Sequence, residues 1–203
     1  MPTSINVRTC VLALHGSLSL FAGLAFLYLH ALMTNLLFDV AAAVSAFIFS
    51  VAALLMAAVI DSLAAFATGI TKVHQFAVYL LAALGAALAA LIIGYHPAVS
   101  LQLLAAFAAA HALLFGLWGL AFAGHASYAR GQRVYIGAFG LLSIVFAIYL
   151  GRNLHVNDSI AIARVGAYTC FVGIKMLLFA WQLHRLSTAD LRPHLSASAS
   201  GTE

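Results

Sequence analysis

Three polar side chains, Arg164, Tyr168 and Lys175, recur along one apolar stretch of the chain, residues 162–181. Each residue of an α-helix turns the chain by about 100°, so the three share one face, and Gln182 continues it. Such a stripe could line a path for protons or ions, or hold buried ion pairs. A charged side chain at the centre of a bilayer costs about 2.5–3.5 kcal/mol on insertion scales. This face is therefore expected to point toward partners inside the protein.

His111 extends the candidate set to a second apolar stretch, residues 98–124. It lies near the middle of that stretch and shares a helical face with Ser100, Trp118 and His125. One interpretation is a neutral imidazole that bonds a neighbouring helix. The other is a proton relay or pH sensor, because histidine titrates in the mildly acidic range.

The two cations of the first stripe have structural alternatives. Arg164 lies near the outer end of its stretch, where its side chain can reach the surface or form an ion pair with Asp39. Lys175 lies deeper, so it either has a buried structural partner or belongs to a pathway. His15, on the cytoplasmic side of the first apolar stretch, can approach Lys175 in depth and completes the set of inward-facing candidates.

The elements that position these residues are expected to be membrane-spanning helices. Of the 203 residues, 65% are hydrophobic and 7% are charged, and the mean hydropathy is +1.09. A water-soluble domain of this size could not bury so much apolar surface, whereas a bilayer requires it. Residues 1–185 are predicted to form one six-helix transmembrane domain, and 186–203 a polar, disordered cytoplasmic tail. The predicted spans are 9–31, 36–60, 74–95, 98–124, 134–151 and 159–183.

The distribution of basic residues predicts the orientation. The first apolar stretch is too long for the h-region of a signal peptide, so it is interpreted as a retained span. If the N-terminus is cytoplasmic, Arg152 is the one Lys or Arg residue that falls in a loop on the outer side of the membrane. Both termini are therefore expected in the cytoplasm, with the protein in a bacterial inner membrane. The basic residues then on the cytoplasmic side are Arg8, Lys72, Arg130, Arg133, Arg185 and Arg192.

Several chemistries are not expected. The nine Lys and Arg residues are scattered, so nucleic acid is not a predicted partner. Cys10 and Cys170 lie at different depths, and the sequence has no HExxH motif and no paired histidines at matched depth for haem. No acidic residue lies near the centre of a predicted span. We therefore expect no enzyme, no catalytic residue, no cofactor and no metal.

The six spans show a weak internal repeat. They are predicted to form three helical hairpins of similar pattern, which implies a pseudo-threefold axis along the bilayer normal. The hairpins are 9–60, 74–124 and 134–183. The odd spans align at Gly16, Gly85 and Gly140, and the even spans at Ser50, Gly116 and Gly173. In this alignment the second span places Thr34, Ser45 and Ala52 on the face that corresponds to the polar stripes.

Small residues recur at helical spacing in the odd spans. They are Gly16, Ser19 and Gly23 in the first span, and Ala83, Ala86, Ala87 and Ala90 in the third. Small side chains let helix backbones approach closely in a membrane, where no hydrophobic effect drives the helices together. These Ala/Gly faces are expected to pack within the protein, in a homo-oligomer or against another membrane protein, and the other predicted partner is the lipid bilayer.

Two segments, "LGAALAALIIGYHPAVSLQLLAAFAAAHALLFGLWGL" and "FGLLSIVFAIYLG…VGIKMLLFA", resemble the HdeD-like acid-resistance membrane proteins. The resemblance covers about residues 10–185. That family has a proline at the turn of each hairpin, and this chain keeps it only at Pro97. The resemblance implies a six-helix inner-membrane protein linked to tolerance of acid stress, and it implies no catalytic residues.

Three functions are consistent with these observations. The first is a non-enzymatic membrane protein of the acid-resistance kind, which modulates membrane stability or proton permeability under acid stress. The second is a small transporter or channel whose path runs between the hairpins and is lined by Arg164, His111 and Lys175. The third is a membrane scaffold that holds partner proteins through its Ala/Gly faces.

Overall fold

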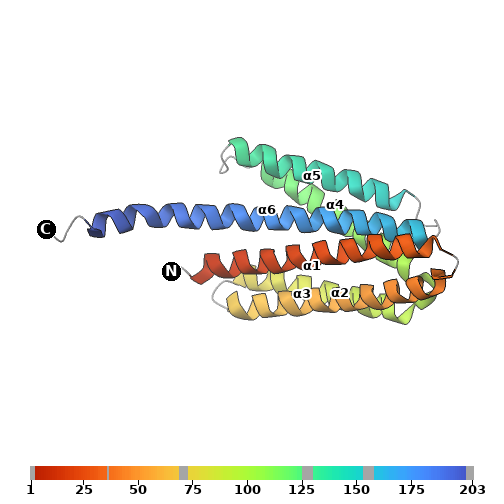
Figure 1. Ribbon diagram of the computed structural model, residues 1–203. Coiled ribbons are helices and arrows are strands. Elements are labelled where there is room, and N and C mark those ends of the chain that lie inside the picture. Colours follow the sequence, from red (N-terminus) through yellow and green to blue (C-terminus); the bar gives the residue numbers. More distant parts are fainter. Residues whose placement is uncertain (1–2, 36, 69–72, 125–129, 153–157, 200–203) are drawn as a thin grey trace.

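The computed structural model describes residues 3–35, 37–68, 73–124, 130–152 and 158–199 (Figure 1). Within these residues the chain forms six long α-helices and no β-strand, which confirms the predicted all-α fold. Each helix contains a segment that is long and apolar enough to cross a membrane, as in a multi-pass membrane protein. The helices are α1 (Thr3–Met33), α2 (Asp39–Thr68), α3 (Val73–Tyr95), α4 (Ser100–Ala123), α5 (Arg130–Gly151) and α6 (Asp158–Ala199). A short 3-10 turn, η2 (Pro97–Val99), precedes α4.

Helix α2 continues beyond the predicted end of its span at residue 60. It reaches Thr68, so the residues after position 60 extend the helix. The residues after Asp61 are mostly alanine, leucine and phenylalanine, which keep the apolar run intact to Ala67. This extension brings Asp61 inside a candidate span.

Helix α6 also differs from the prediction at its C-terminal end. It continues to Ala199, whereas residues 186–203 were expected to be a disordered tail. The expectation of disorder through residue 199 is thus not met. Once a long helix exists, each added residue needs no new nucleation, so residues 186–199 can continue it, although Pro193 contributes no backbone N–H to the helix. Residues 200–203 lie outside the described part of the chain.

The helices pack most extensively in three pairs. Helix α1 lies along α6, α4 lies along α5, and α2 lies along α3. Figure 1 shows α1 and α6 side by side, with α2 and α3 on one side of them and α5 on the other, while α4 crosses behind them from the side of α2 and α3 toward α5. Helix α1 begins and α6 ends toward the same end of the bundle. Buried residues of all six helices form one apolar cluster, including Phe26, Ile93 and Leu150.

The pair α1 and α6 is held together by glycines that face each other in antiparallel register. A Cβ atom on Gly16 would lie 3.1 Å from the carbonyl oxygen of Gly173, and one on Gly23 would lie 2.8 Å from that of Gly166. The glycines are spaced by seven residues on both helices, so the same edge of each helix returns to the contact. Backbones in direct contact gain the van der Waals energy that associates helices in a membrane.

The pair α4 and α5 has the same kind of contact. A Cβ atom on Gly116 would lie 2.9 Å from the carbonyl oxygen of Gly140. Gly85 of α3 was aligned with Gly16 and Gly140, but a Cβ atom there would meet nothing within 4 Å. The buried small residues of α3 are instead Ala83, Ala89 and Ala90.

Helices α5 and α6 instead meet through aromatic rings. The ring of Phe171 stacks on Phe139 and Phe146 of α5, with centroids 5.8 Å and 5.0 Å away. Farther along, Tyr135 lies with its ring centroid 5.4 Å from that of Phe179. Rings need more room between backbones than glycines do, so this contact is made mainly by side chains.

Candidate functional site

His111 and Tyr168 form a hydrogen bond between α4 and α6. The Nδ1 atom of His111 lies 2.6 Å from the hydroxyl oxygen of Tyr168, and the direction of donation depends on the imidazole tautomer. Tyr168 is buried, and its ring packs against Phe146 of α5. The helix face predicted to point inward therefore does so at Tyr168, where the hydroxyl reaches the imidazole.

Lys175 lies two turns farther along the same face of α6 and is buried, with 7% of its surface exposed. Its ammonium nitrogen lies 5.2 Å from the ring centroid of Phe115 on α4 and 5.6 Å from that of Phe171. In the part of the chain that the structure describes, no carboxylate lies within ion-pair distance of it. The faces of the two rings attract the cation, but they carry no negative charge that could neutralise it.

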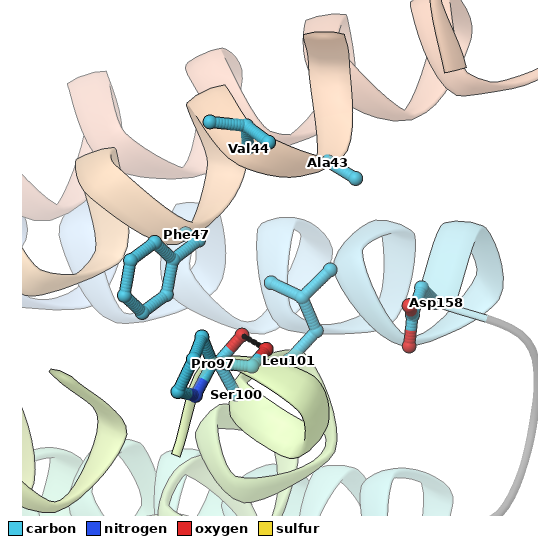
Figure 2. A pocket seen from close by; sticks show the side chains of 7 residues that line it. All are labelled: Ala43, Val44, Phe47, Pro97, Ser100, Leu101 and Asp158. Atoms are coloured by element: carbon cyan, nitrogen blue, oxygen red, sulfur yellow. Dashed lines mark hydrogen bonds between the residues drawn. The ribbon is translucent and has the colours of Figure 1, made fainter. Parts of the chain in front are cut away.

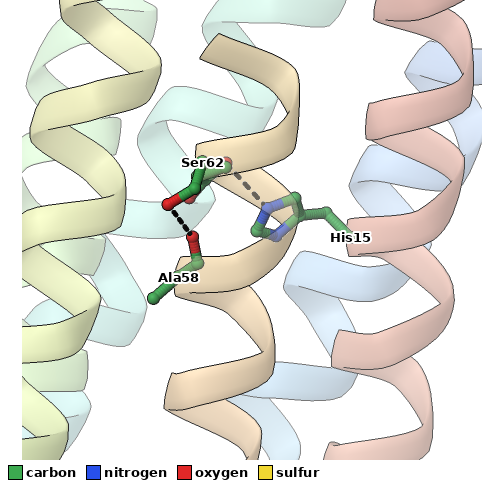
Figure 3. A network of polar contacts seen from close by, with 4 residues as sticks. His15, Ala58 and Ser62 are labelled. Carbon is green, nitrogen blue, oxygen red and sulfur yellow. Dashed lines mark hydrogen bonds and ion pairs between the residues drawn. The ribbon is translucent and has the colours of Figure 1, made fainter. Parts of the chain in front are cut away.

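His15 of α1 pairs with Asp61 of α2, a residue that the sequence analysis did not single out. The Nε2 atom of His15 lies 2.9 Å from Oδ1 of Asp61, and both side chains are mostly buried. Figure 3 shows the imidazole reaching from α1 toward α2 beside Ser62, whose hydroxyl donates to the carbonyl oxygen of Ala58. The uninterrupted apolar run after residue 60 was the signal that could have placed Asp61 inside the span.

His15 and Lys175 lie at the same level of the bundle. Gly16, next to His15, approaches both Gly173 and Leu177, which flank Lys175 in the sequence. The ring of Phe115 on α4 contacts both the imidazole of His111 and the ammonium group of Lys175. The structure thus gathers one group of titratable side chains from four helices. We call it the interior polar group, and it consists of His15, Asp61, His111, Tyr168 and Lys175.

Arg164 does not form the predicted ion pair with Asp39. Its Nη1 donates to the carbonyl oxygen of Tyr149 at 3.5 Å, and its guanidinium carbon lies 4.9 Å from the centroid of that ring. Asp39 is exposed at the start of α2, and the two residues make no ion pair. The prediction is wrong because α5 supplies the neighbour of this part of α6.

On α2 and α4, only some residues of the predicted polar faces are buried inside the protein. His111 is half-buried and Ser100 is buried, but Trp118 is 50% exposed. Ser45 of α2 is exposed, and its hydroxyl donates to the carbonyl oxygen of Ala41 in its own helix. The three even helices therefore do not present equivalent polar faces. His125 lies outside the described residues.

A small pocket lies apart from the interior polar group, between α2, the start of α4 and the start of α6 (Figure 2). Phe47, Pro97 and Leu101 give it an apolar lining, and Asp158 is its one charged residue. The hydroxyl of Ser100 donates to the carbonyl oxygen of Pro97, so it is already occupied. Across the described ranges, no cluster of three His, Cys, Asp or Glu residues is arranged to hold a metal ion.

No family model, curated protein or solved structure matches this chain. The resemblance to HdeD-like proteins therefore rests on the sequence segments quoted above.

Proposed function

We propose that this chain is a non-enzymatic protein of the bacterial inner membrane that alters proton permeability under acid stress. The observation that carries the proposal is the interior polar group, which collects two histidines, an aspartate, a tyrosine and a lysine in apolar surroundings. Ionisable side chains within membrane spans are costly, and they commonly mark proton or ion pathways. The resemblance to acid-resistance proteins supports the same function.

The chemistry of the group suits proton handling. Histidine gains and loses a proton in the mildly acidic range, where acid stress begins. The hydrogen bond between His111 and Tyr168 joins two groups that can each give and accept a proton. The pair of His15 and Asp61 is a second such unit at the level of Lys175. A proton that enters this region meets several acceptors close together.

The three-hairpin repeat and the cytoplasmic termini belong to the same proposal. Each odd helix packs against an even helix of another hairpin: α1 on α6, α3 on α2 and α5 on α4. Two of these pairs have a glycine-to-glycine contact, Gly16 with Gly173 and Gly140 with Gly116. This cyclic order of contacts is the one that a pseudo-threefold arrangement requires. The excess of basic residues on one side supports termini in the cytoplasm.

A second candidate is a small transporter or channel, and it is favoured by the stripe along α6. Arg164, Tyr168, Phe171 and Lys175 follow one another at spacings of four, three and four residues, so they form one continuous line. The line begins near the start of α6 and runs into the bundle. A scaffold is less well supported, because Gly16, Gly23 and Gly173 are used in contacts within the chain.

The proposal is tested by proton flux in proteoliposomes that contain the purified protein and an internal pH dye. After an external acid jump, vesicles with the wild-type protein should acidify at a rate different from that of empty vesicles. Vesicles with heat-denatured protein control for leaks caused by added protein. Identical traces from all three preparations would remove proton permeability as the function.

A further inference from the structure

We propose that the interior polar group binds a small monovalent anion of the size of chloride, next to the ammonium group of Lys175 between α4 and α6. The first argument is the balance of charge around Lys175. This side chain is more than nine-tenths buried, and aromatic rings are its neighbours. A buried ammonium group needs a negative partner or has to give up its proton.

The aspartates of the described spans do not supply that partner. Asp61 is the acid at the same level, and its carboxylate bonds His15. Asp39 and Asp158 are the first residues of α2 and α6, far along the bundle from Lys175. When His15 is protonated, its charge balances that of Asp61, so the charge of Lys175 is left over inside the bundle and one small anion would neutralise it.

The second argument is a hydrogen-bond donor on the facing helix. The Nδ1 atom of His111 is bonded to the hydroxyl of Tyr168, so Nε2 is the nitrogen left for another partner. When the tyrosine hydroxyl donates to Nδ1, the neutral imidazole carries its proton on Nε2 and can donate it to an anion. The ring of Phe115 contacts both His111 and the ammonium group of Lys175, which places the two donors around one aromatic side chain.

Three features select the class of anion. One uncompensated charge and one further donor match a monovalent ion, whereas phosphate or sulfate would need several more donors. The surrounding side chains of Phe115 and Phe171 are apolar, which favours an ion that sheds its water easily. The faces of these rings hold the ammonium group, so the anion would approach their edges, which carry partial positive charge.

Anion binding would be coupled to protons. The titratable groups that face Lys175 are His111 from α4, His15 from α1 with Asp61 from α2, and Tyr168 on its own helix. Helix α5 contributes phenylalanine rings at this level. A proton on His111 or His15 adds positive charge, so the affinity for the anion should rise as the pH falls. This coupling rests on the proposed function, whereas the site itself does not.

The test is binding of radioactive chloride to the purified protein in detergent, at pH 7 and at pH 5, with gluconate replacing chloride to keep the ionic strength constant. Saturable binding that bromide displaces and gluconate does not is expected, with an affinity several-fold higher at pH 5. Lys175→Met should abolish binding, and Arg152→Gln, in an exposed position, should leave it unchanged. His111→Gln gives a second variant that should weaken binding about tenfold.

Absence of saturable chloride binding to the wild-type protein would overturn the anion site, whatever the variants do. Binding that persists unchanged in Lys175→Met would overturn it as well. Proton flux measured in chloride-free, gluconate-loaded vesicles separates the two proposals. Proton flux without chloride binding would support the proposed function and overturn the anion site. Chloride binding without proton flux would support the anion site and overturn the proposed function.

Discussion

The Nε2 atom of His15 lies 2.9 Å from Oδ1 of Asp61, at the level of the bundle where Lys175 is buried. This pair joins α1 to α2, so the carboxylate at the depth of Lys175 is hydrogen-bonded to a histidine and not to the lysine. The cation on α6 is thus left among aromatic rings. The arrangement separates a paired histidine from an unpaired lysine, and this separation underlies the functional proposals.

Replacing Asp61 with asparagine should destabilise the protein by about 1–3 kcal/mol, because a mostly buried hydrogen bond to a charged group is weakened. Reversible unfolding in mixed micelles would measure the change. Asp39→Asn, at an exposed position, is the matched control and should change stability by less than about 0.5 kcal/mol. Equal effects of the two substitutions would show that the pair of His15 and Asp61 has no stabilising role.

Replacing Gly173 with alanine should separate α1 from α6. The added Cβ would lie 2.5 Å from the backbone nitrogen of Leu20, and backbone cannot move aside as a flexible side chain can. We expect a loss of about 1–3 kcal/mol, as for other overpacked interiors. Gly85→Ala is the control, because nothing lies within 4 Å and alanine favours helix by about 1 kcal/mol over glycine.

Thermal unfolding of the two glycine variants in the same detergent checks this prediction. A lower midpoint for Gly173→Ala, with an equal or higher midpoint for Gly85→Ala, is expected. If both variants unfold at the wild-type temperature, the close approach of α1 and α6 does not contribute to stability.

The hydrogen bond between His111 and Tyr168 should appear as a coupling in a double-mutant cycle. Tyr168→Phe removes the hydroxyl, His111→Phe removes the imidazole, and the double variant lacks both. Hydrogen bonds between membrane helices couple by about 0.6 kcal/mol on average and up to about 1.7 kcal/mol. Unfolding free energies that add without coupling would mean that the two side chains do not bond in the membrane.

Replacing Lys175 with methionine should raise stability in the absence of chloride. Methionine fills a similar volume between the rings of Phe115 and Phe171 and removes a buried charge without a carboxylate partner. Exchanging buried charges for apolar side chains has stabilised other proteins by about 1–4 kcal/mol. Unfolding in gluconate buffer measures the effect, and a large loss of stability would instead identify Lys175 as a structural residue.

Much of the fold could be predicted because the bilayer imposes a simple rule. Each span needs a long apolar run, so all six helices could be located from hydropathy. The same rule indicated that Tyr168 and Lys175 point inward, since lipid would not tolerate them. Both residues are buried.

The remaining features depend on contacts between helices that sequence periodicity does not record. Arg164 was paired with Asp39 because both lie near the outer ends of their spans, but the helix beside Arg164 is α5, which supplies Tyr149. Asp61 was overlooked because its span was ended at residue 60, whereas the apolar run continues to Ala67, so the pair with His15 could not be anticipated. Of the small residues predicted to pack in the third span, Ala83 and Ala90 are buried, whereas Gly85, which served only to align the repeats, would meet nothing within 4 Å of an added Cβ.

The most direct test of the central claim compares proton flux through wild-type protein with flux through His111→Gln and Lys175→Met in the same proteoliposomes. His96→Gln, in an exposed connection, is the control. We predict that the wild-type flux increases as the external medium is acidified, and that His96→Gln behaves identically. Both interior variants should lose this increase. If they retain the wild-type flux at every pH, the interior polar group is structural and the proposed function is wrong.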